Sequence, residues 1–391
     1  GGSGKTSLSE VLLYTAGEIN RIGNVLEGNT VSDYTSNEIE KQISISTSLM
    51  HIEWNGKKIN ILDTPGYSDF MGDVKSALKV CDTAVMIIKS AEGIEVGSEV
   101  TGKFVNEFKL PSAIIINKVD NEHSTFEETL EKTKERLTSG AIVVTFPVSE
   151  GLNFNAVVDV IKMKAFTYGD AGSKKVTESE IPANLKTKAD DYRTQLIEKI
   201  AESSEELMNK YFETGSLSDS DIETGLKASI ISRSFSPVFA ISANKAVGLN
   251  NFLDFVTQYF PSPADRGGEE AQLSGKSEKV LVKPDSAGEP VLFVFKTVAE
   301  QHVGELSLFK VYSGTVKAGL DLINESNGKT ERLSQLSILN GRNRKDVTQI
   351  TAGDLGAVVK LKDTHTNNTL ASKSLSVIID EIEFPEAVIR S

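Results

Sequence analysis

The chain has 391 residues, which is long enough for two or three domains of ordinary size. Hydrophobic residues make up 39% and charged residues 25%, a balance typical of globular proteins rather than of disordered chains. A net charge of −13 argues against unspecific binding to bare nucleic acid. The sequence contains no run of about 18 apolar residues, so it predicts no membrane span. Cys81 is the single cysteine, so an internal disulfide is excluded and a reducing, cytoplasmic setting fits best.

The first part of the chain alternates helix-like and strand-like segments. Short, continuous apolar runs at 84–88 and 113–116 are typical of strands buried on both faces of a parallel sheet. This alternation predicts an α/β fold. In chain order we expect a helix at 7–16, strands at 44–53 and 58–62, a helix at 73–79, the strand at 84–88, a helix at 99–108, the strand at 113–116 and a helix at 126–137.

The pattern changes twice further along the chain. We expect an inserted α+β subdomain at about 150–235, within which the stretch 178–228 is charged and has helical spacing. A strand at 238–241 and a helix at 249–259 then resume the α/β pattern. Short β-like runs between turns then predict an all-β barrel. We therefore expect an α/β domain over 1–262 that includes the insertion, a linker at 263–288, a barrel at 289–383, and at 384–391 the start of a further connection.

The chain opens with the second half of the phosphate-binding motif G-x-x-x-x-G-K-[ST]. Its glycines let backbone N–H groups turn toward phosphate oxygens, Lys5 neutralises the β and γ phosphates, and the Thr6 hydroxyl binds Mg²⁺. The helix that follows points its positive N-terminus at the same anion. Alone, this stretch also fits a flexible turn. The candidate residues for the nucleotide are Gly2, Ser3, Gly4, Lys5, Thr6 and Ser7.

The first glycine of the motif would lie two residues before Gly1, and the strand that normally leads into such a loop is absent from the sequence. Because that strand is usually central to the sheet, we expect the sequence to be truncated at its N-terminus relative to the natural polypeptide.

Three further motifs each follow a predicted strand. In Asn117-Lys118-Val119-Asp120, the Asp120 carboxylate would accept hydrogen bonds from guanine N1–H and N2–H₂, which adenine does not offer, while Asn117 braces the loop and Lys118 lies along the base. Asp63-Thr64-Pro65-Gly66 suits a Mg²⁺ ligand, Asp63, and a γ-phosphate contact from the Gly66 N–H. Ser242-Ala243-Asn244 would place a backbone N–H on guanine O6. Each motif alone also fits an ordinary turn, but their joint occurrence in this order is improbable by chance.

With these motifs, nearly the whole chain resembles the translational GTPases of the elongation factor G type. The 122 positions between Asp120 and Ser242 leave room for the insertion of that family, and 157–165 resembles its start. The stretches 309–314, 352–356 and 359–363 resemble its β-barrel second domain, and Phe384-Pro385-Glu386 resembles the lead into its third.

The resemblance implies Mg²⁺-dependent binding and hydrolysis of GTP to GDP and phosphate, stimulated by the ribosome. It also implies a cytoplasmic monomer with no membrane contact, whose partners are ribosomal RNA and proteins and, indirectly, transfer and messenger RNA. Translocation is expected of a full-length protein, because the family carries three more domains. The implied catalytic residues are Tyr67, Gly66 and Lys5, and the implied metal ligands are Thr6, Ser44 and Asp63.

Three positions depart from the family pattern and predict an elongation-factor-G-like paralogue. Ser44 stands where the family has a Mg²⁺-binding threonine, and Gly2 where it has an aspartate. Tyr67 replaces the histidine that positions the attacking water, and a phenol stays neutral near pH 7 and cannot act like an imidazolium. Three alternatives stay open: a GTP-binding switch protein with weak catalysis, a GTPase of the ribosome-protection or release-factor type, and an ATP-using P-loop enzyme, against which Asp120 argues.

Overall fold

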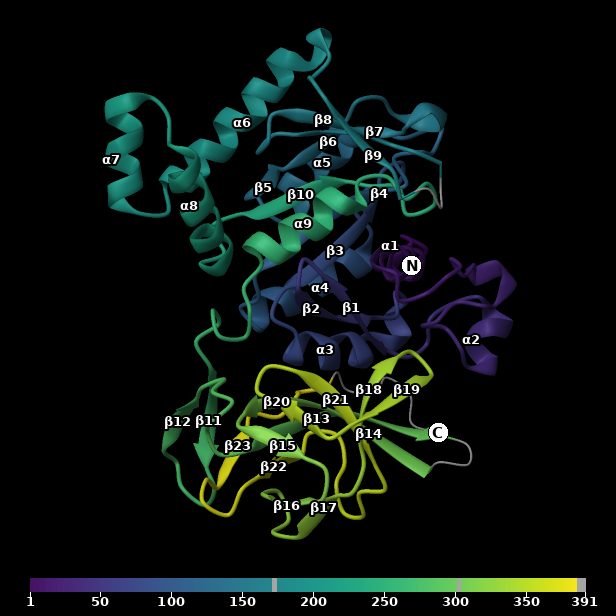
Figure 1. Ribbon diagram of the computed structural model, residues 1–391, viewed down its shortest axis with the longest axis vertical. Helices are drawn as coiled ribbons and strands as arrows, with labels where there is room; N and C mark the ends of the chain where they lie inside the picture. The colour runs from purple at the N-terminus through teal and green to yellow at the C-terminus, as the bar shows by residue number, and fades with distance from the viewer. Residues whose placement is uncertain (171–173, 301–303, 385–391) are drawn as a thin grey trace.

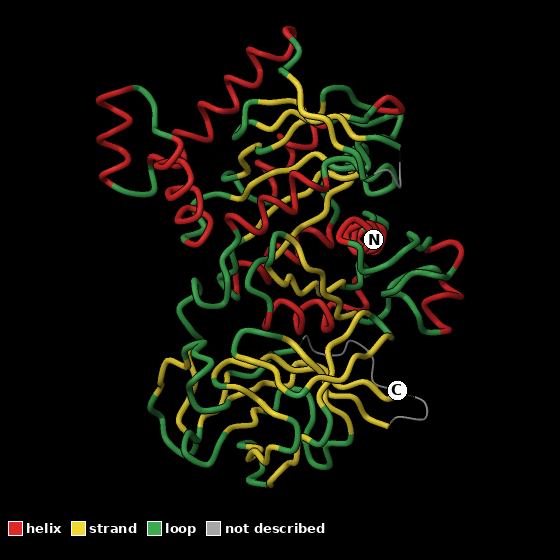
Figure 2. Tube along the Cα trace, in the orientation of Figure 1, coloured by secondary structure: helices red, strands yellow, loops and turns green. Residues whose placement is uncertain are grey.

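The structure is a computed structural model that describes residues 1–170, 174–300 and 304–384. Two parts follow one another along the long axis of the molecule (Figure 1). The first part mixes helices and strands, whereas the second consists of strands and loops in its described residues (Figure 2). Within the described ranges, no helix is long and apolar enough to cross a membrane.

A parallel sheet with the strand order β3-β4-β10-β5 forms the centre of the first part. Strands β4, β5 and β10 are short apolar runs buried along almost their whole length, as expected for a sheet that helices cover on both faces. The prediction of an α/β domain is therefore confirmed. The strands are β3 (Ala84–Lys89), β4 (Ser112–Asn117), β5 (Ala141–Val143) and β10 (Ser236–Ala240), and the main helices of this domain are α1 (Lys5–Ala16), α3 (Met71–Val80), α4 (Val96–Glu107), α5 (Phe126–Arg136) and α9 (Leu249–Tyr259).

An antiparallel hairpin of β1 (Ser48–Trp54) and β2 (Lys57–Asp63) lies beside this sheet without pairing with it. Its tight turn uses Asn55 and Gly56, both at positive φ, which matches the right-handed twist of the strands. A cavity of about 860 Å³ separates β2 from β3, and apolar side chains of both strands line it.

Strand β1 begins at Ser48 and not at Ser44, as the sequence analysis expected. The residues before it form a loop, 44–47, whose backbone N–H groups bind carboxylates. Glu38, in the short helix α2 (Ser36–Lys41), accepts from the N–H groups of residues 45 and 46 at 3.1 and 3.2 Å. Asp73 accepts from that of Thr47 at 2.6 Å. A backbone held in this way has no N–H left for a strand ladder.

The predicted inserted subdomain consists of an antiparallel sheet in the order β6-β7-β8-β9 and three helices beside it. It lies at the end of the molecule remote from the second part (Figure 1). Its elements are β6 (Thr145–Pro147), β7 (Ala156–Asp159), β8 (Lys164–Tyr168), β9 (Val176–Ser179), α6 (Lys186–Ala201), α7 (Glu205–Thr214) and α8 (Asp219–Ile231).

The second part is built on an antiparallel sheet in the order β17-β16-β22-β13-β14-β21-β18-β19, with the small pair β15-β20 beside it. Alternate side chains of β13 and β14 enter two separate apolar clusters, one inside the curled sheet and one toward the first part. The prediction of a barrel-like β domain is confirmed. Its strands are β13 (Val291–Glu300), β14 (Gly304–Ser313), β15 (Thr315–Lys317), β16 (Leu320–Asn324), β17 (Thr330–Leu333), β18 (Leu336–Asn340), β19 (Asn343–Val347), β20 (Gln349–Thr351), β21 (Leu355–Val359) and β22 (Thr369–Ala371).

The segment expected to be a linker at 263–288 contains two strands. These are β11 (Glu269–Leu273) and β12 (Lys279–Val282), which form a small antiparallel sheet with β23 (Val377–Ile379). Ala271 and Val282 are buried, while the positions on either side of each are exposed, among them the charged Glu270 and Lys283. A sheet with one solvated face has the polar composition of a linker, which explains the difference. The connection expected at 384–391 lies outside the described residues except for Phe384.

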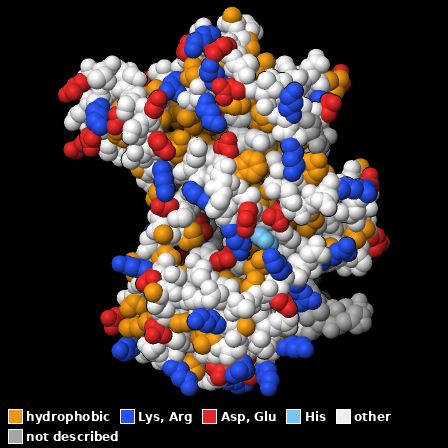
Figure 3. Space-filling model, in the orientation of Figure 1, with side chains coloured by type: hydrophobic (Ala, Val, Ile, Leu, Met, Phe, Trp, Pro, Cys, Tyr) orange, Lys and Arg blue, Asp and Glu red, His pale blue; other side chains and the backbone are white. Residues whose placement is uncertain are grey.

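The interface between the two parts is called the waist below. On the surface, acidic and basic side chains gather along it (Figure 3). Gly341, in the turn between β18 and β19, lies so close to the first part that a Cβ there would collide with the backbone of Val31. Three ion pairs with N–O distances of 2.8 Å cross the waist, namely Lys58–Asp354, Lys79–Glu269 and Lys310–Asp82.

A buried polar triad ties α9 to the inserted subdomain. Asn251 donates to Asp159 at 2.9 Å and accepts from the Tyr168 hydroxyl at 2.6 Å, and all three side chains are buried. Burial raises the pKa of the Asp159 carboxyl, whereas the Asn251 hydrogen bond opposes that rise.

We expect Asn251→Ala to lower the free energy of unfolding by about 2 kcal/mol, because Asp159 and Tyr168 would stay buried without their hydrogen bonds to the Asn251 side chain. Asn250→Ala, one position along α9 on a more exposed side chain, is the matched control and should change it little. Urea denaturation followed by circular dichroism measures both variants. An equal loss in the two would contradict a special role for the triad.

Candidate functional site

The loop before α1 has the shape that the phosphate-binding motif predicts. Gly2 and Gly4 have φ of 64° and 90°, in the left-handed region that glycine adopts readily. Gly4 is the N-cap of α1, Ser3 is buried, and Ser7 lies half-buried in the first turn of the helix. The helix therefore begins at a loop whose free backbone N–H groups and positive dipole favour an anion.

Lys5 joins this loop to the Asp63-x-x-Gly66 loop at the end of β2. A Cβ at Gly66 would collide with Nζ of Lys5, so a larger residue at this position would displace the end of the lysine side chain. Burial lowers the pKa of the Lys5 ammonium, and the carboxylates of Asp63 and Asp33 oppose that shift. A half-buried cation in this position is poised to pair with an anion that enters the site.

Hydroxyl and carboxylate oxygens gather on one side of Lys5. The Thr6 and Ser44 hydroxyl oxygens lie 3.0 Å apart, although these residues come from different segments. Asp63 is buried, and burial followed by the nearby Asp33 raises its pKa to about 6. Among the described residues, one buried oxygen of each of these two carboxylates has no hydrogen-bond partner. All three metal ligands expected from the sequence therefore meet here.

This oxygen set fits Mg²⁺. The ion prefers oxygen ligands and usually takes only one or two carboxylates, with substrate phosphates and water completing its shell. The described part of the chain contains no cluster of three or more histidine, cysteine or acidic side chains that could hold a metal alone.

Asp33 is the residue that sequence reasoning missed. It belongs to none of the motifs, and it lies 30 positions before Asp63 in the printed sequence. Only the folded chain brings it to Lys5, and burial raises the pKa of its carboxyl while hydrogen bonds from Ser44 and Thr6 oppose the rise.

Asn117, at the end of β4, joins three loops. Its side-chain amide donates to the Ser3 carbonyl at 2.8 Å, and its side-chain oxygen accepts from the Ala243 N–H at 3.1 Å. The side chain is 1% exposed, so both bonds form away from water. The phosphate loop, the N-K-x-D loop and the S-A-N loop are thereby fixed to one another.

Asp120 offers an open acceptor beside these loops. Its Oδ1 is buried and makes no hydrogen bond within the described residues. The next motif is adjacent, because the Val119 N–H donates to the Ile241 carbonyl at 3.4 Å. A buried carboxylate oxygen without a donor is costly, and a base that brings two N–H groups would remove that cost.

The other residues expected at the base lie around this point. Lys118 has a φ of 62°, which turns the chain at the strand end. The Ser242 hydroxyl oxygen accepts from the N–H of Lys245 at 3.1 Å and so fixes its own loop. Ala243, whose N–H donates to the Asn117 side chain, is buried, whereas Asn244 is exposed.

Tyr67 follows directly on Gly66 and lies at the edge of the phosphate loop. Its side chain is 47% exposed, and a Cβ at Gly1 would be 3.1 Å from the carbon that carries its hydroxyl. It precedes a short 3₁₀ turn, Ser68–Phe70, that leads into α3. The phenol is therefore near the phosphate side of the site and still open to solvent.

The fold and these converging loops define a P-loop nucleotide-binding protein, and comparisons with known proteins identify its family. Residues 2–262 match the family model of the elongation factor Tu GTP binding domain, and residues 290–373 match that of elongation factor G domain 2. Elongation factor G 1 of Syntrophomonas wolfei subsp. wolfei is 31% identical over 388 residues, which are 99% of this chain and 58% of that protein. A crystal structure of a protein from Thermus thermophilus gives a TM-score of 0.84 at 26% identity, over 98% of this chain and 53% of that one.

The chain therefore belongs to the translational GTPases of the elongation factor G type. It spans somewhat more than half of the length of the two relatives.

The close approach of Gly4 to Asn117 can be tested directly. A Cβ at Gly4 would lie 2.5 Å from the Asn117 amide nitrogen, whereas one at Gly2 would meet nothing within 4 Å. Both glycines have positive φ, so alanine strains the backbone at either position. We expect Gly4→Ala to weaken GDP binding at least about tenfold more than Gly2→Ala, because it also breaks the Asn117–Ser3 bond. Calorimetric titration measures both, and equal effects would contradict the role of Asn117 as the link between the loops.

Proposed function

We propose that this chain binds GTP with Mg²⁺ and hydrolyses it to GDP and phosphate. The observation that carries the proposal is the buried, unpartnered oxygen of Asp120 beside a loop that Asn117 ties to the phosphate loop. Guanine presents two neighbouring N–H donors to such a carboxylate, and adenine does not. The base of one nucleotide would then lie at Asp120, and its phosphates would lie at the phosphate loop.

The roles follow from position. The N–H groups from Gly2 to Ser7 would hold the phosphates, and the Lys5 ammonium would neutralise the charge that develops between the β and γ groups. Mg²⁺, when bound, supplies further positive charge at the phosphates, and Thr6, Ser44 and Asp63 would hold it. The Gly66 N–H would contact the γ-phosphate, and Tyr67 would orient the attacking water through its hydroxyl.

We propose further that the chain acts on the ribosome, as part of a cytoplasmic, monomeric elongation factor of the elongation factor G type whose whole length performs translocation. Its membership of that family supports this proposal. The presence of Tyr67 keeps a second candidate open, namely a GTP-binding switch protein with weak catalysis, and a ribosome-protection or release-factor type of GTPase stays a third.

Asp120→Asn tests the choice of base. An amide donates a hydrogen bond where the carboxylate accepts, so it repels the guanine N2–H₂ group and suits a base with a carbonyl at that position, such as xanthine. We expect GTP affinity to fall about a hundredfold and XTP affinity to rise, because a mismatched polar group in a buried site costs about 2–3 kcal/mol. Competition binding with GTP, XTP and ATP measures this. Unchanged preference for GTP would contradict the assignment of Asp120.

Tyr67→His and Tyr67→Phe, assayed with and without ribosomes, test catalysis and the working context together. We expect ribosomes to stimulate turnover by the unchanged chain, Tyr67→Phe to lower kcat about tenfold through loss of the hydroxyl, and Tyr67→His to restore or raise it. Equal turnover in all three would leave Tyr67 without a catalytic role. Tight GTP binding with no stimulation by ribosomes would favour the switch protein.

A further inference from the structure

Lys296 of the β domain reaches the loop of the nucleotide-binding domain that carries Ser44. Nζ of Lys296, on β13, donates to the carbonyl oxygen of Thr47 at 3.1 Å and to the hydroxyl oxygen of Ser46. It also forms an ion pair with Asp73 of α3 at 2.5 Å. The lysine side chain is only 9% exposed, so its three partners take the place of water.

An irregularity of β13 aims this side chain. Val294 pairs with Phe309 and Lys296 pairs with Leu308, so Phe295 is an extra residue that interrupts the ladder. By simple alternation Lys296 would share the face of Val294, which belongs to the interior cluster. The bulge instead turns it to the face of Leu308, which belongs to the cluster that contacts the first domain.

The segment that Lys296 holds is the loop 44–47, which carries Ser44. Glu38 already accepts hydrogen bonds from two N–H groups of this loop. The Asp73 carboxylate accepts from the Thr47 N–H, and the Asp73 backbone carbonyl accepts from the Thr47 hydroxyl at 3.1 Å. Lys296 also joins Asp73 to the same loop, so its loss removes one of the links that hold the loop to the helix that follows the Asp63-x-x-Gly66 motif. The Ser44 hydroxyl, 3.0 Å from that of Thr6, depends on this arrangement for its place.

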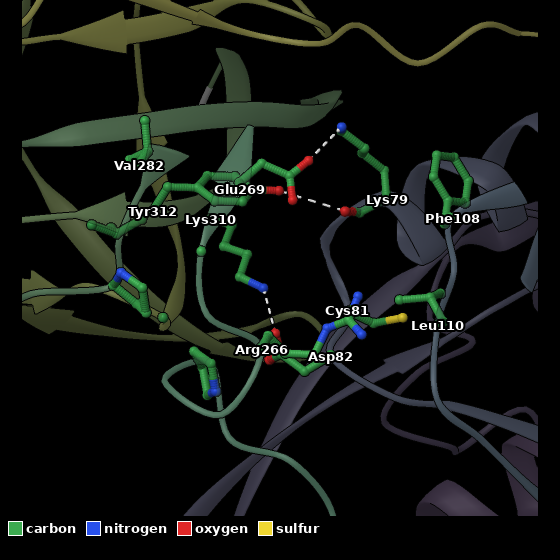
Figure 4. A pocket seen from close by; sticks show the side chains of 15 residues that line it. Lys79, Cys81, Asp82, Phe108, Leu110, Arg266, Glu269, Val282, Lys310 and Tyr312 are labelled. Atoms are coloured by element: carbon green, nitrogen blue, oxygen red, sulfur yellow. Dashed lines mark hydrogen bonds and ion pairs between the residues drawn. The ribbon is translucent and has the colours of Figure 1, made fainter. Parts of the chain in front are cut away.

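The opposite end of α3 is held by a second lysine of the β domain. Nζ of Lys310, on β14, donates to the Val80 carbonyl and to Asp82, both at 2.8 Å. Figure 4 shows the contact between Lys310 and Asp82. Its side chain is 8% exposed, much like that of Lys296. Lys310 contacts no residue of the loop 44–47 among the contacts described, which makes it a matched control.

We propose that Lys296 is a positioning residue through which the β domain sets the metal side of the nucleotide site. By holding the loop 44–47 and Asp73 together, it keeps the Ser44 hydroxyl beside that of Thr6, where the two would help to hold Mg²⁺. GDP is bound by the phosphate loop and Asp120, which Lys296 does not touch. The lysine therefore favours the triphosphate over the diphosphate, an inference that rests on the proposed function.

The test compares Lys296→Met with Lys310→Met, using GDP and the non-hydrolysable β,γ-imido analogue of GTP in the presence of Mg²⁺. We expect Lys296→Met to weaken binding of the analogue about tenfold and to leave GDP affinity unchanged, since partners in one ion-pair network couple by this amount. Lys310→Met should leave the ratio of the two affinities as in the unchanged chain. Lys296→Arg, which keeps the charge, should recover most of the ratio.

A second readout needs no nucleotide. Lys296→Met should speed amide hydrogen exchange at residues 45–47, and Lys310→Met should not. If Lys296→Met fails to fold, Asp73→Asn replaces it, because this change removes the charge of the partner and should shift the affinity ratio in the same direction.

The possible failures are distinguishable. If the unchanged chain binds neither nucleotide, the proposed function is wrong. If it binds both and the affinity ratio and the exchange rates are the same in Lys296→Met, the proposed function stands and the coupling through Lys296 is overturned. An equal change of the ratio in Lys296→Met and Lys310→Met also overturns it, because a general loosening of the waist would then be the cause.

Discussion

The bridge made by the Asn117 side chain is the interaction on which the site depends. A phosphate loop leaves its N–H groups unpaired so that an anion can use them, and such a loop needs support from elsewhere to keep its shape. Asn117 gives that support from the strand that also leads to Asp120, and it binds the Ala243 N–H with the other end of its amide. One buried side chain thus fixes the phosphate loop relative to Asp120, and so sets the distance between the two proposed ends of the site, one for phosphates and one for the base.

The sequence predicted the parts of the site that follow strands, because the carboxyl ends of parallel strands lie at one edge of a sheet. Asn117, Asp120 and Ser242 could be placed in this way. The rest depends on contacts between distant segments, which periodicity does not report. The loop 44–47 reads as a strand because its residues alternate, yet Glu38 and Asp73 take its N–H groups. Asp33 and the hairpin β11–β12 were missed for the same reason, since burial of one carboxylate or of one sheet face is decided only in the folded chain.

The same contacts give the substitution at Ser44 a physical meaning. A β-branched threonine has few χ1 rotamers, whereas a serine has more freedom and holds its hydroxyl in place less well by itself. In this chain the loop around Ser44 is fixed from three sides, by Glu38, by Asp73 and by Lys296. Restraint that the side chain itself lacks is supplied by its neighbours, and one of these neighbours belongs to the β domain.

The electrostatics of the site explain why it would bind a charged ligand strongly. Lys5, Asp63 and Asp33 lie close together. Burial lowers the pKa of Lys5 and raises the pKa values of Asp63 and Asp33, so it favours the neutral form of each group. Unpartnered carboxylate oxygens in such a place lower the stability of the folded chain. A cation between the carboxylates and an anion on Lys5 would remove these costs at the same time, so either ligand should favour the other. Without ligands these groups lower the stability of the folded chain, and for that reason the site is suited to take a metal ion and a nucleotide together.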